Sequence, residues 1–369
     1  MPPTPPRLPL RPELVGLAPY GAPQLDVPVL LNVNENPYPP SPAVVAEVVT
    51  AVQAAAEGLN RYPDRDFRAL RADLAEYLAV ESGVSLATEQ VWAANGSNEV
   101  MLHLLQAFGG PGRTAVSFAP TYSMYPEYAR DTATGWVTGR RAEDFSLEPG
   151  HAAQVVADRQ PSVVLLASPN NPTGTALPLE TVRAVLAAAA EVAGGCVVVV
   201  DEAYAEFRRE GTPSALTLLA AHPHLAVART MSKAFGMAGA RIGYLAASSE
   251  LVDALRVVRL PYHLSAVTQA VARAALAHRE ELMAQVGALR RERDALVAWL
   301  RRRGLRVADS DANFVLFGVF DDRHAIWQGL LQRGVLIRET GPDGWLRVSV
   351  GTPDETAAFR AALVEVAGL

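Results

Sequence analysis

The chain has 369 residues, of which half are apolar and a fifth are charged, and its 39 carboxylates and 33 basic side chains give a formal net charge of −6. This composition suffices for a packed core and excludes wholesale disorder. The acidic balance argues against a general affinity for nucleic acid or for anionic membranes.

Residues 1–40 are rich in proline and predict an extended arm. Two helices are expected at 43–57 and 66–81. Short apolar strands then alternate with helices, and they are expected at 91–94, 114–118, 162–167, 196–200, 225–228 and 242–246. This alternation predicts an α/β fold with a mainly parallel central sheet flanked by helices, whose strands form a ligand crevice at their carboxyl ends.

The pattern changes after about residue 255. Long arginine-rich helices over 266–303 precede short strands near 313–319, 334–338 and 345–350, and a last helix follows. We therefore expect a second, smaller α+β domain.

The expected division gives residues 1–40 to an N-terminal arm that packs with the small domain, residues 41–255 to a large domain, and residues 256–369 to the small domain. The arginine runs at 290–293 and 301–303 are expected on the solvated face of their helix.

Several classes of protein are disfavoured. A single cysteine, Cys196, cannot form a disulfide within the chain. No apolar stretch approaches the length of a membrane span, and the N-terminus lacks the apolar segment of a signal peptide, so we expect a cytoplasmic protein. Zinc-binding HExxH, the Walker A motif, the GxSxG elbow and a GxGxxG loop after a strand do not occur, and no metal is expected.

Lys233 is the only lysine, whereas the other 32 basic side chains are arginines. Arginine stays protonated, but a desolvated lysine can lose its proton and act as an amine nucleophile that forms a Schiff base. A surface lysine kept by chance is the alternative. Its position after a predicted strand favours a catalytic amine.

Asp201 and Tyr204 follow another predicted strand. A carboxylate at that place can keep a heterocyclic nitrogen protonated, which pyridoxal phosphate requires to act as an electron sink. The alternatives are an aspartate that caps a helix and a tyrosine that only packs.

An anion site is suggested by Gly96, Ser97 and Asn98, which open a predicted helix. Free N–H groups and the helix dipole attract phosphate there, although many helices begin in this way. Ser232 and Arg241 could complete such a site.

Three further residues could contact a ligand. Tyr122 could stack on a flat ring. Asn171 stands in an Asn-Asn-Pro-Thr-Gly segment, which could also be merely a turn. Arg347 lies within an apolar strand and requires a buried anionic partner, either a structural carboxylate or a substrate.

Together these residues resemble the class I/II, fold-type I pyridoxal-phosphate-dependent aminotransferases. The order Asn-Pro-Thr-Gly, Asp-Glu-Ala-Tyr, Ser-Lys and then Arg carries the resemblance. More narrowly, the chain is similar to the subgroup that transaminates histidinol phosphate in histidine biosynthesis. The segments that carry this similarity are 31–37, 61–64, 120–125, 229–241 and 346–352.

The resemblance implies that Lys233 carries pyridoxal phosphate as a Schiff base and then moves protons. It implies that Asp201 pairs with the pyridine nitrogen, that Asn171 and Tyr204 bond the ring oxygen, and that Tyr122 stacks on the ring. The residues implied around the cofactor phosphate are Gly96, Ser97, Asn98, Thr230, Ser232, Arg241 and the partner subunit's Tyr62. The residues implied to hold the substrate are Tyr20, Asn34, Arg338 and Arg347.

The implied enzyme is an obligate homodimer with shared active sites that exchanges amino groups between small anionic amino and oxo acids by a ping-pong route. Three alternatives remain open from the sequence: an aminotransferase of the same subgroup for aromatic amino acids, a phosphothreonine decarboxylase, and a non-catalytic regulator that binds the cofactor. The regulator predicts loss of Lys233, Asp201 or Arg347, and all three are present.

Overall fold

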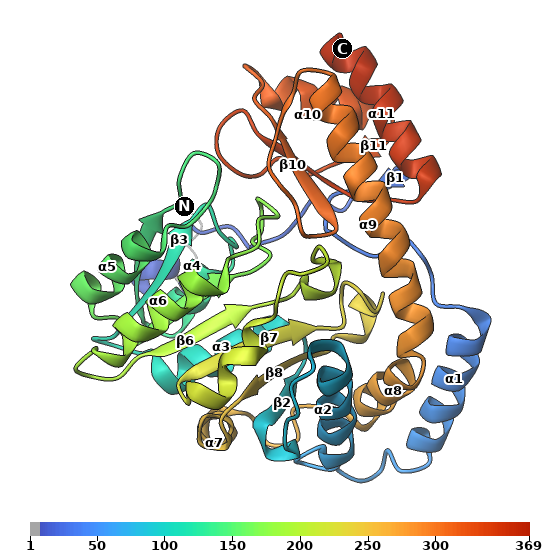
Figure 1. The fold of residues 1–369 in the computed structure, drawn as a ribbon. Coiled ribbons are helices and arrows are strands. Elements are labelled where there is room, and N and C mark those ends of the chain that lie inside the picture. The colour runs from blue at the N-terminus through green and yellow to red at the C-terminus, as the bar shows by residue number, and fades with distance from the viewer. Residues whose placement is uncertain (1–7) are drawn as a thin grey trace, which may run out of the picture.

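A seven-stranded sheet forms the centre of the molecule in the computed structural model, which describes residues 8–369 (Figure 1). Its spatial order is β2-β8-β7-β6-β5-β3-β4, and only β8 runs antiparallel to its neighbours. The strands are β2 (Val91–Ala94), β3 (Thr114–Ala119), β4 (Gly135–Arg140), β5 (Val163–Ala167), β6 (Val197–Asp201), β7 (Leu225–Thr230) and β8 (Gly243–Ala247). The predicted α/β class with a mainly parallel sheet is confirmed.

Strand β4 has no counterpart among the predicted strands. It lies at the edge of the sheet and pairs only with β3. Five of its six residues are exposed or half-buried, so it lacks the continuous apolar run that marks the interior strands. Edge strands need bury only part of their surface, which weakens the sequence signal.

Helices cover both faces of this sheet. They are α1 (Pro42–Ala56), α2 (Arg68–Ser82), α3 (Ser97–Phe108), α4 (Tyr125–Asp131), α5 (Pro149–Arg159), α6 (Leu179–Ala190), α7 (Ser249–Val258) and α8 (Ala266–Ala277). One large apolar core joins the sheet to these helices, and Trp92, Phe118 and Leu245 are fully buried in it. Within residues 8–369, no helix is both long and apolar enough to span a membrane.

A second layered unit contains the three-stranded antiparallel sheet β12-β10-β9 and lies above the large sheet in Figure 1. Its elements are α9 (Arg279–Arg302), β9 (Arg306–Val307), β10 (Phe314–Gly318), α10 (Arg323–Gln332), β11 (Val335–Leu336), β12 (Leu346–Ser349) and α11 (Pro353–Ala367). Strand β1 (Val29–Leu30) comes from the N-terminal segment and pairs parallel with β11. Residues 29–30 therefore pack with the smaller unit.

The division near residue 255 remains a prediction. Helix α8, which lies after that point, packs on α1 and α2 and contributes Ala272, Ala275 and Leu276 to the large core. Helix α9 then crosses from one unit to the other (Figure 1). The part of the expected arm before residue 8 lies outside the described residues.

The expectation that the arginines of 290–293 are solvated is wrong for Arg293, which is fully buried. Its guanidinium donates to the carbonyl oxygens of Phe207 at 2.7 Å and Ala312 at 3.3 Å. Backbone carbonyls satisfy this charge at the junction of the two units, and a run of arginines in the sequence does not reveal such partners.

Candidate active site

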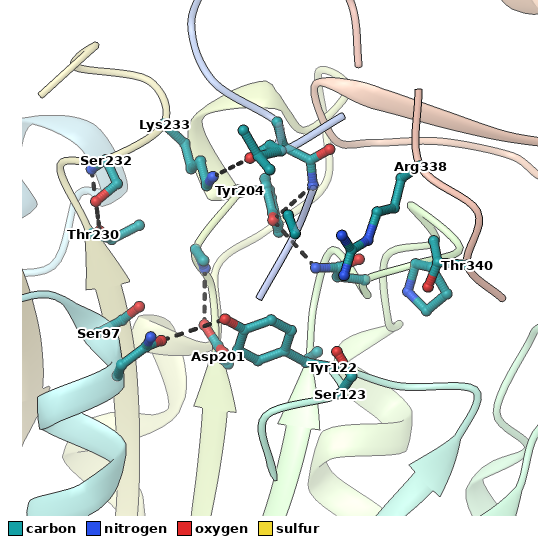
Figure 2. Close-up of a pocket in the computed structure, with 18 of the residues that line it drawn as sticks. Ser97, Tyr122, Ser123, Asp201, Tyr204, Thr230, Ser232, Lys233, Arg338 and Thr340 are labelled. Carbon is teal, nitrogen blue, oxygen red and sulfur yellow. Dashed lines mark hydrogen bonds between the residues drawn. The ribbon is translucent and has the colours of Figure 1, made fainter. Parts of the chain in front are cut away.

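A cavity of about 250 Å³ opens where the strands of the large sheet end and the smaller unit begins (Figure 2). It brings together fourteen of the sixteen residues that the sequence assigned to the site. These are Tyr20, Asn34, Ser97, Asn98, Tyr122, Asn171, Asp201, Tyr204, Thr230, Ser232, Lys233, Arg241, Arg338 and Arg347. Gly96 and Tyr62 are not in its wall.

Lys233 follows β7 and points its amine into this cavity (Figure 2). The amine donates a hydrogen bond to the carbonyl oxygen of Val33 at 2.8 Å. Burial, together with the positive charge of Arg347, lowers the pKa of Lys233 to about 8. A substantial fraction of this amine is therefore neutral near pH 8 and can act as a nucleophile or a base.

Asp201 is the last residue of β6 and is buried at the floor of the cavity. Its carboxylate accepts hydrogen bonds from the hydroxyl of Tyr125 at 2.9 Å and from the backbone N–H of Ala203 at 3.2 Å. Burial raises the pKa of Asp201 to about 6. A buried carboxylate in this state is stabilised by a cationic N–H donor, and a protonated pyridine nitrogen is such a donor.

The hydroxyl of Tyr204 lies between two side-chain amides. Asn34 donates to it at 3.0 Å, and Asn171 approaches it at 3.5 Å. The tyrosine follows β6 by one tight turn and is buried, and its burial raises its pKa. The hydroxyl therefore stays protonated at neutral pH and can donate a hydrogen bond.

One end of the cavity is suited to an anion. Helix α3 begins there at Ser97, and Gly96 precedes it with a positive φ of 86°. The predicted anion residue Arg241 has its guanidinium against Gly96, where a side chain would collide with it. A side chain at Gly243 would collide with the backbone at Gly96 and Ser97, so glycine is needed for this close approach.

Two hydroxyls, one from the last residue of β7 and one from the loop that follows, face the same end (Figure 2). Thr230 donates to the hydroxyl of Ser232 at 3.0 Å and accepts from the backbone N–H of Ser232 at 3.1 Å. Together with the N-terminus of α3 and Arg241, they supply the donors that phosphate requires.

The opposite end carries two guanidiniums. Arg347 is 6 % exposed, donates to Asn171 Oδ1 at 2.5 Å and to the carbonyl oxygen of Asn32 at 2.8 Å, and its Nε has no partner among the described residues. Burial lowers the pKa of Arg347 to about 10. Arg338 pairs with the backbone of Arg347 and lines the same wall.

Within residues 8–369, neither Arg338 nor Arg347 forms an ion pair with a carboxylate. Tyr20 lies beside them and shares a hydrogen bond of 2.9 Å with the hydroxyl of Ser123. A buried guanidinium without a protein carboxylate is suited to an anionic ligand.

Tyr62 lies away from this cavity. It is 79 % exposed and stacks on Tyr262, with the ring centroids 4.3 Å apart and the planes at 14°. The resemblance assigned this tyrosine to the site of a second subunit, and its exposure is compatible with that assignment.

Several groups that shape the cavity have no counterpart among the predicted site residues. Val33 and Asn32 act through their carbonyl oxygens, which side-chain patterns do not reveal. Tyr125 bonds Asp201 from a helix start 76 residues earlier, and Thr340 reaches the wall from a loop of the smaller unit. The segments at 31–37 and 120–125 gave a sequence signal for the regions that contain Asn32, Val33 and Tyr125, but not for these individual contacts.

Comparison with known proteins agrees with this geometry. Residues 27–363 match the family model described as aminotransferase class I and II. The chain is 62 % identical over 362 residues to histidinol-phosphate aminotransferase 3 of Burkholderia lata, covering 98 % of this chain and 96 % of that protein. It is 62 % identical over 361 residues to histidinol-phosphate aminotransferase of Thermobifida fusca, with the same two coverages.

Solved structures are similar in fold. Histidinol-phosphate aminotransferase from Sinorhizobium meliloti, in complex with pyridoxal-5'-phosphate, superposes with a TM-score of 0.80 at 26 % identity, covering 92 % of this chain and 91 % of that one. A mutant aspartate aminotransferase of Thermus thermophilus gives a TM-score of 0.78 at 28 % identity, covering 91 % of this chain and 94 % of that one.

Proposed function

Because this chain belongs to the aminotransferase class I and II family, we propose that it transfers an amino group between histidinol phosphate and 2-oxoglutarate, giving imidazole acetol phosphate and glutamate, in histidine biosynthesis. The identity of 62 % over nearly the full length to relatives named for this reaction supports the assignment. The observation that carries it is one cavity that holds a buried amine, a buried carboxylate and two guanidiniums that pair with no carboxylate among residues 8–369.

Pyridoxal phosphate fits these residues. Lys233 offers the only side-chain amine of the chain, and Asp201 offers a buried carboxylate that has no cationic partner among residues 8–369. The cavity is open where α3 begins, and Ser97, Asn98, Thr230, Ser232 and Arg241 line it there. When bound, the cofactor supplies an electron sink for the bonds at the substrate's amino-bearing carbon. Ser97, Thr230 and the residues around them would hold its phosphate, and Tyr122 would lie against its ring.

Three side chains of the protein would carry out the proton transfers and orient the cofactor. Lys233 Nζ would bind the cofactor covalently and then, once displaced by the substrate's amine, take a proton from the substrate carbon and return it. Its lowered pKa suits a base that works near neutral pH. Asp201 would keep the pyridine nitrogen protonated, and the hydroxyl of Tyr204 would orient the ring by donating a hydrogen bond.

The same basic end would accept both substrates. Histidinol phosphate carries a phosphate and glutamate a second carboxylate, and the planar fork of an arginine binds either anion. Arg347 would provide the buried contact, whereas Arg338 and Tyr20 would complete the site near its opening. A shared site requires that the amino donor leaves as an oxo acid before the acceptor enters.

We further propose a homodimer with shared active sites in the cytoplasm. Helix α1 has a nearly all-apolar sequence, yet Val44 is its only buried residue, and Val45 and Val49 are 47 % and 58 % exposed. Leu59 and Tyr62, which follow α1 in the chain, are also exposed. Exposed apolar side chains of this kind are covered most simply by a second copy. In that arrangement the partner subunit's Tyr62 would complete the phosphate site.

A comparison of substrates tests the assignment. The purified holoenzyme should show a higher kcat/KM for histidinol phosphate than for phenylalanine, with 2-oxoglutarate as acceptor, and should release no carbon dioxide from phosphothreonine. A preference for phenylalanine would replace the histidine-pathway assignment with an aromatic aminotransferase, and decarboxylation of phosphothreonine would replace it with a lyase. Stable cofactor binding without turnover of any of the three would indicate a regulator.

A further inference from the structure

Asn34 is buried, and hydrogen bonds fix both its backbone and its side chain. It is 1 % exposed, and its φ of 57° lies in the left-handed region, which asparagine tolerates better than most residues. Its backbone carbonyl accepts a hydrogen bond from Asn313 at 3.1 Å, and its side-chain Nδ2 donates to the hydroxyl of Tyr204 at 3.0 Å. Backbone and side chain are therefore both fixed.

Ser349 determines which end of the Asn34 amide faces Tyr204. The hydroxyl oxygen of Ser349 accepts the backbone N–H of Asn34 at 2.9 Å, so its own hydrogen is free to be donated to Asn34 Oδ1 at 3.1 Å. Because Oδ1 can only accept, this bond leaves Nδ2 as the end that points at Tyr204.

Arg347 fixes the side-chain amide of Asn171 so that its Nδ2 also faces Tyr204. Its guanidinium donates to Asn171 Oδ1 at 2.5 Å, which leaves Asn171 Nδ2 facing the Tyr204 hydroxyl at 3.5 Å. Two N–H groups thus point at one phenolic oxygen. Their donation occupies its lone pairs, and among residues 8–369 no protein acceptor takes its hydrogen.

We propose that Asn34 is a positioning residue that directs the hydroxyl hydrogen of Tyr204 into the cavity and strengthens it as a donor. This rests on the proposed function, in which that hydroxyl bonds the ring oxygen of pyridoxal phosphate. Hydrogen bonds in a chain polarise one another, so an O–H whose oxygen accepts from Asn34 donates more strongly. Asn34 therefore acts through Tyr204.

The test measures the pH midpoint of the visible absorbance of the holoenzyme, with saturating pyridoxal phosphate. A donor to the ring oxygen draws negative charge away from the neighbouring proton of the lysine-bound cofactor, so a weaker donor raises the midpoint. Asn34→Gly keeps the left-handed backbone but removes the amide. We expect an upward shift of about 0.5 pH unit, the size of one modest hydrogen bond.

Tyr204→Phe decides whether the effect passes through the hydroxyl. This variant alone should raise the midpoint further than Asn34→Gly, and adding Asn34→Gly to it should change nothing more. Asn36→Ala is the matched control, because Asn36 lies two residues away on the same segment, is not part of the cavity wall, and donates its amide to the carbonyl oxygen of Ala234 and to Gln285 instead. Its midpoint should equal that of the unmodified enzyme.

Additive shifts of Asn34→Gly and Tyr204→Phe, or an unchanged midpoint in Asn34→Gly, would overturn the inference. If Asn34→Gly does not fold, Ser349→Ala serves instead, since it leaves Asn34 in place but releases its Oδ1, and a smaller upward shift is expected. Failure of cofactor binding would be distinguishable, because the unmodified protein would then show no cofactor absorbance to titrate, and failure of the substrate assignment would appear in the comparison of kcat/KM values and leave the midpoints unaffected.

Discussion

The amine of Lys233 donates a hydrogen bond of 2.8 Å to the carbonyl oxygen of Val33, a residue 200 positions earlier in the chain. The next carbonyls on either side of this one are also occupied, since Asn32 accepts from Arg347 and Asn34 accepts from Asn313. A single short segment of the N-terminal part thus holds the proposed nucleophile and the proposed substrate arginine. The segment links the cofactor end of the cavity to its anion-binding end.

The lowered pKa of Lys233 predicts how cofactor uptake depends on pH. Its pKa of about 8 lies below the ordinary value of 10.5, so the nucleophilic neutral amine accumulates as the pH rises through 8. The rate at which visible absorbance appears after mixing cofactor-free protein with pyridoxal phosphate should rise with pH and level off above about 8. A rate that still climbs steeply up to pH 10 would contradict the burial argument.

Asp201→Asn should lower kcat and should also change how the free energy of unfolding depends on pH. We expect kcat to fall by a factor on the order of 10² to 10³, as for the loss of one preorganised charged contact.

The folded pKa of Asp201, about 6, exceeds the ordinary value of 3.8, so the native state binds more protons between those values. The free energy of unfolding of the cofactor-free protein should therefore fall as pH rises from about 4 to 6.

The asparagine variant lacks this titration. Its cofactor-free form should lose less stability over the same pH interval than the unmodified protein, as measured by urea denaturation at several pH values. Equal pH dependence of the two proteins would show that Asp201 does not carry the raised pKa.

Gly243→Ala should weaken cofactor binding. The added methyl group would collide with the backbone of Gly96 and Ser97, where α3 begins, and would displace the proposed phosphate site. Overpacking of this kind costs about 1–3 kcal/mol, so the dissociation constant for pyridoxal phosphate should rise about tenfold or more. Fluorescence titration of the cofactor-free protein measures this constant.

Gly239→Ala is the matched control for that experiment. Gly239 lies four residues earlier, in the loop that leads into β8; it has no positive φ, and a side chain there would meet no neighbour. Its dissociation constant should stay within about twofold of the unmodified protein. A comparable weakening in both variants would mean that the loop, and not the contact with α3, governs binding.

Val49→Glu should disrupt the proposed homodimer. The substitution places a charge in the middle of the exposed apolar face of α1, where a partner would have to desolvate it. Sedimentation should show a monomer, and activity should fall because the partner's Tyr62 is lost. Val49→Ala should remain dimeric, and a Val49→Glu protein that is still a fully active dimer would place the interface elsewhere.

Much of the fold followed from the sequence because the interior strands are continuous apolar runs that end in polar segments. Asp201 and Lys233 could be identified in the same way, since each follows such a run at the carboxyl edge of the sheet. Strand β4 was missed because an edge strand needs no continuous apolar run. The carbonyl oxygen of Val33 was missed because any residue type could supply it.

The orientation of hydrogen bonds also lay beyond the sequence. Asn34 was assigned to the substrate from the resemblance, whereas its contacts to Tyr204 and Ser349 depend on three segments that only the folded chain brings together. Arg293 is a similar case, because its burial depends on where α9 crosses the junction. Packing between segments far apart in the chain determines both the contacts of Asn34 and the burial of Arg293.

The most direct test of the account is borohydride reduction of the holoenzyme followed by peptide mapping, together with the absorbance of Lys233→Arg. The pyridoxyl group should be found on Lys233, the only lysine, and the visible absorbance of the lysine-bound cofactor should be absent from the arginine variant, which keeps the charge but cannot form the bond. Persistence of that absorbance in Lys233→Arg, or a label on any other residue, would contradict the central assignment.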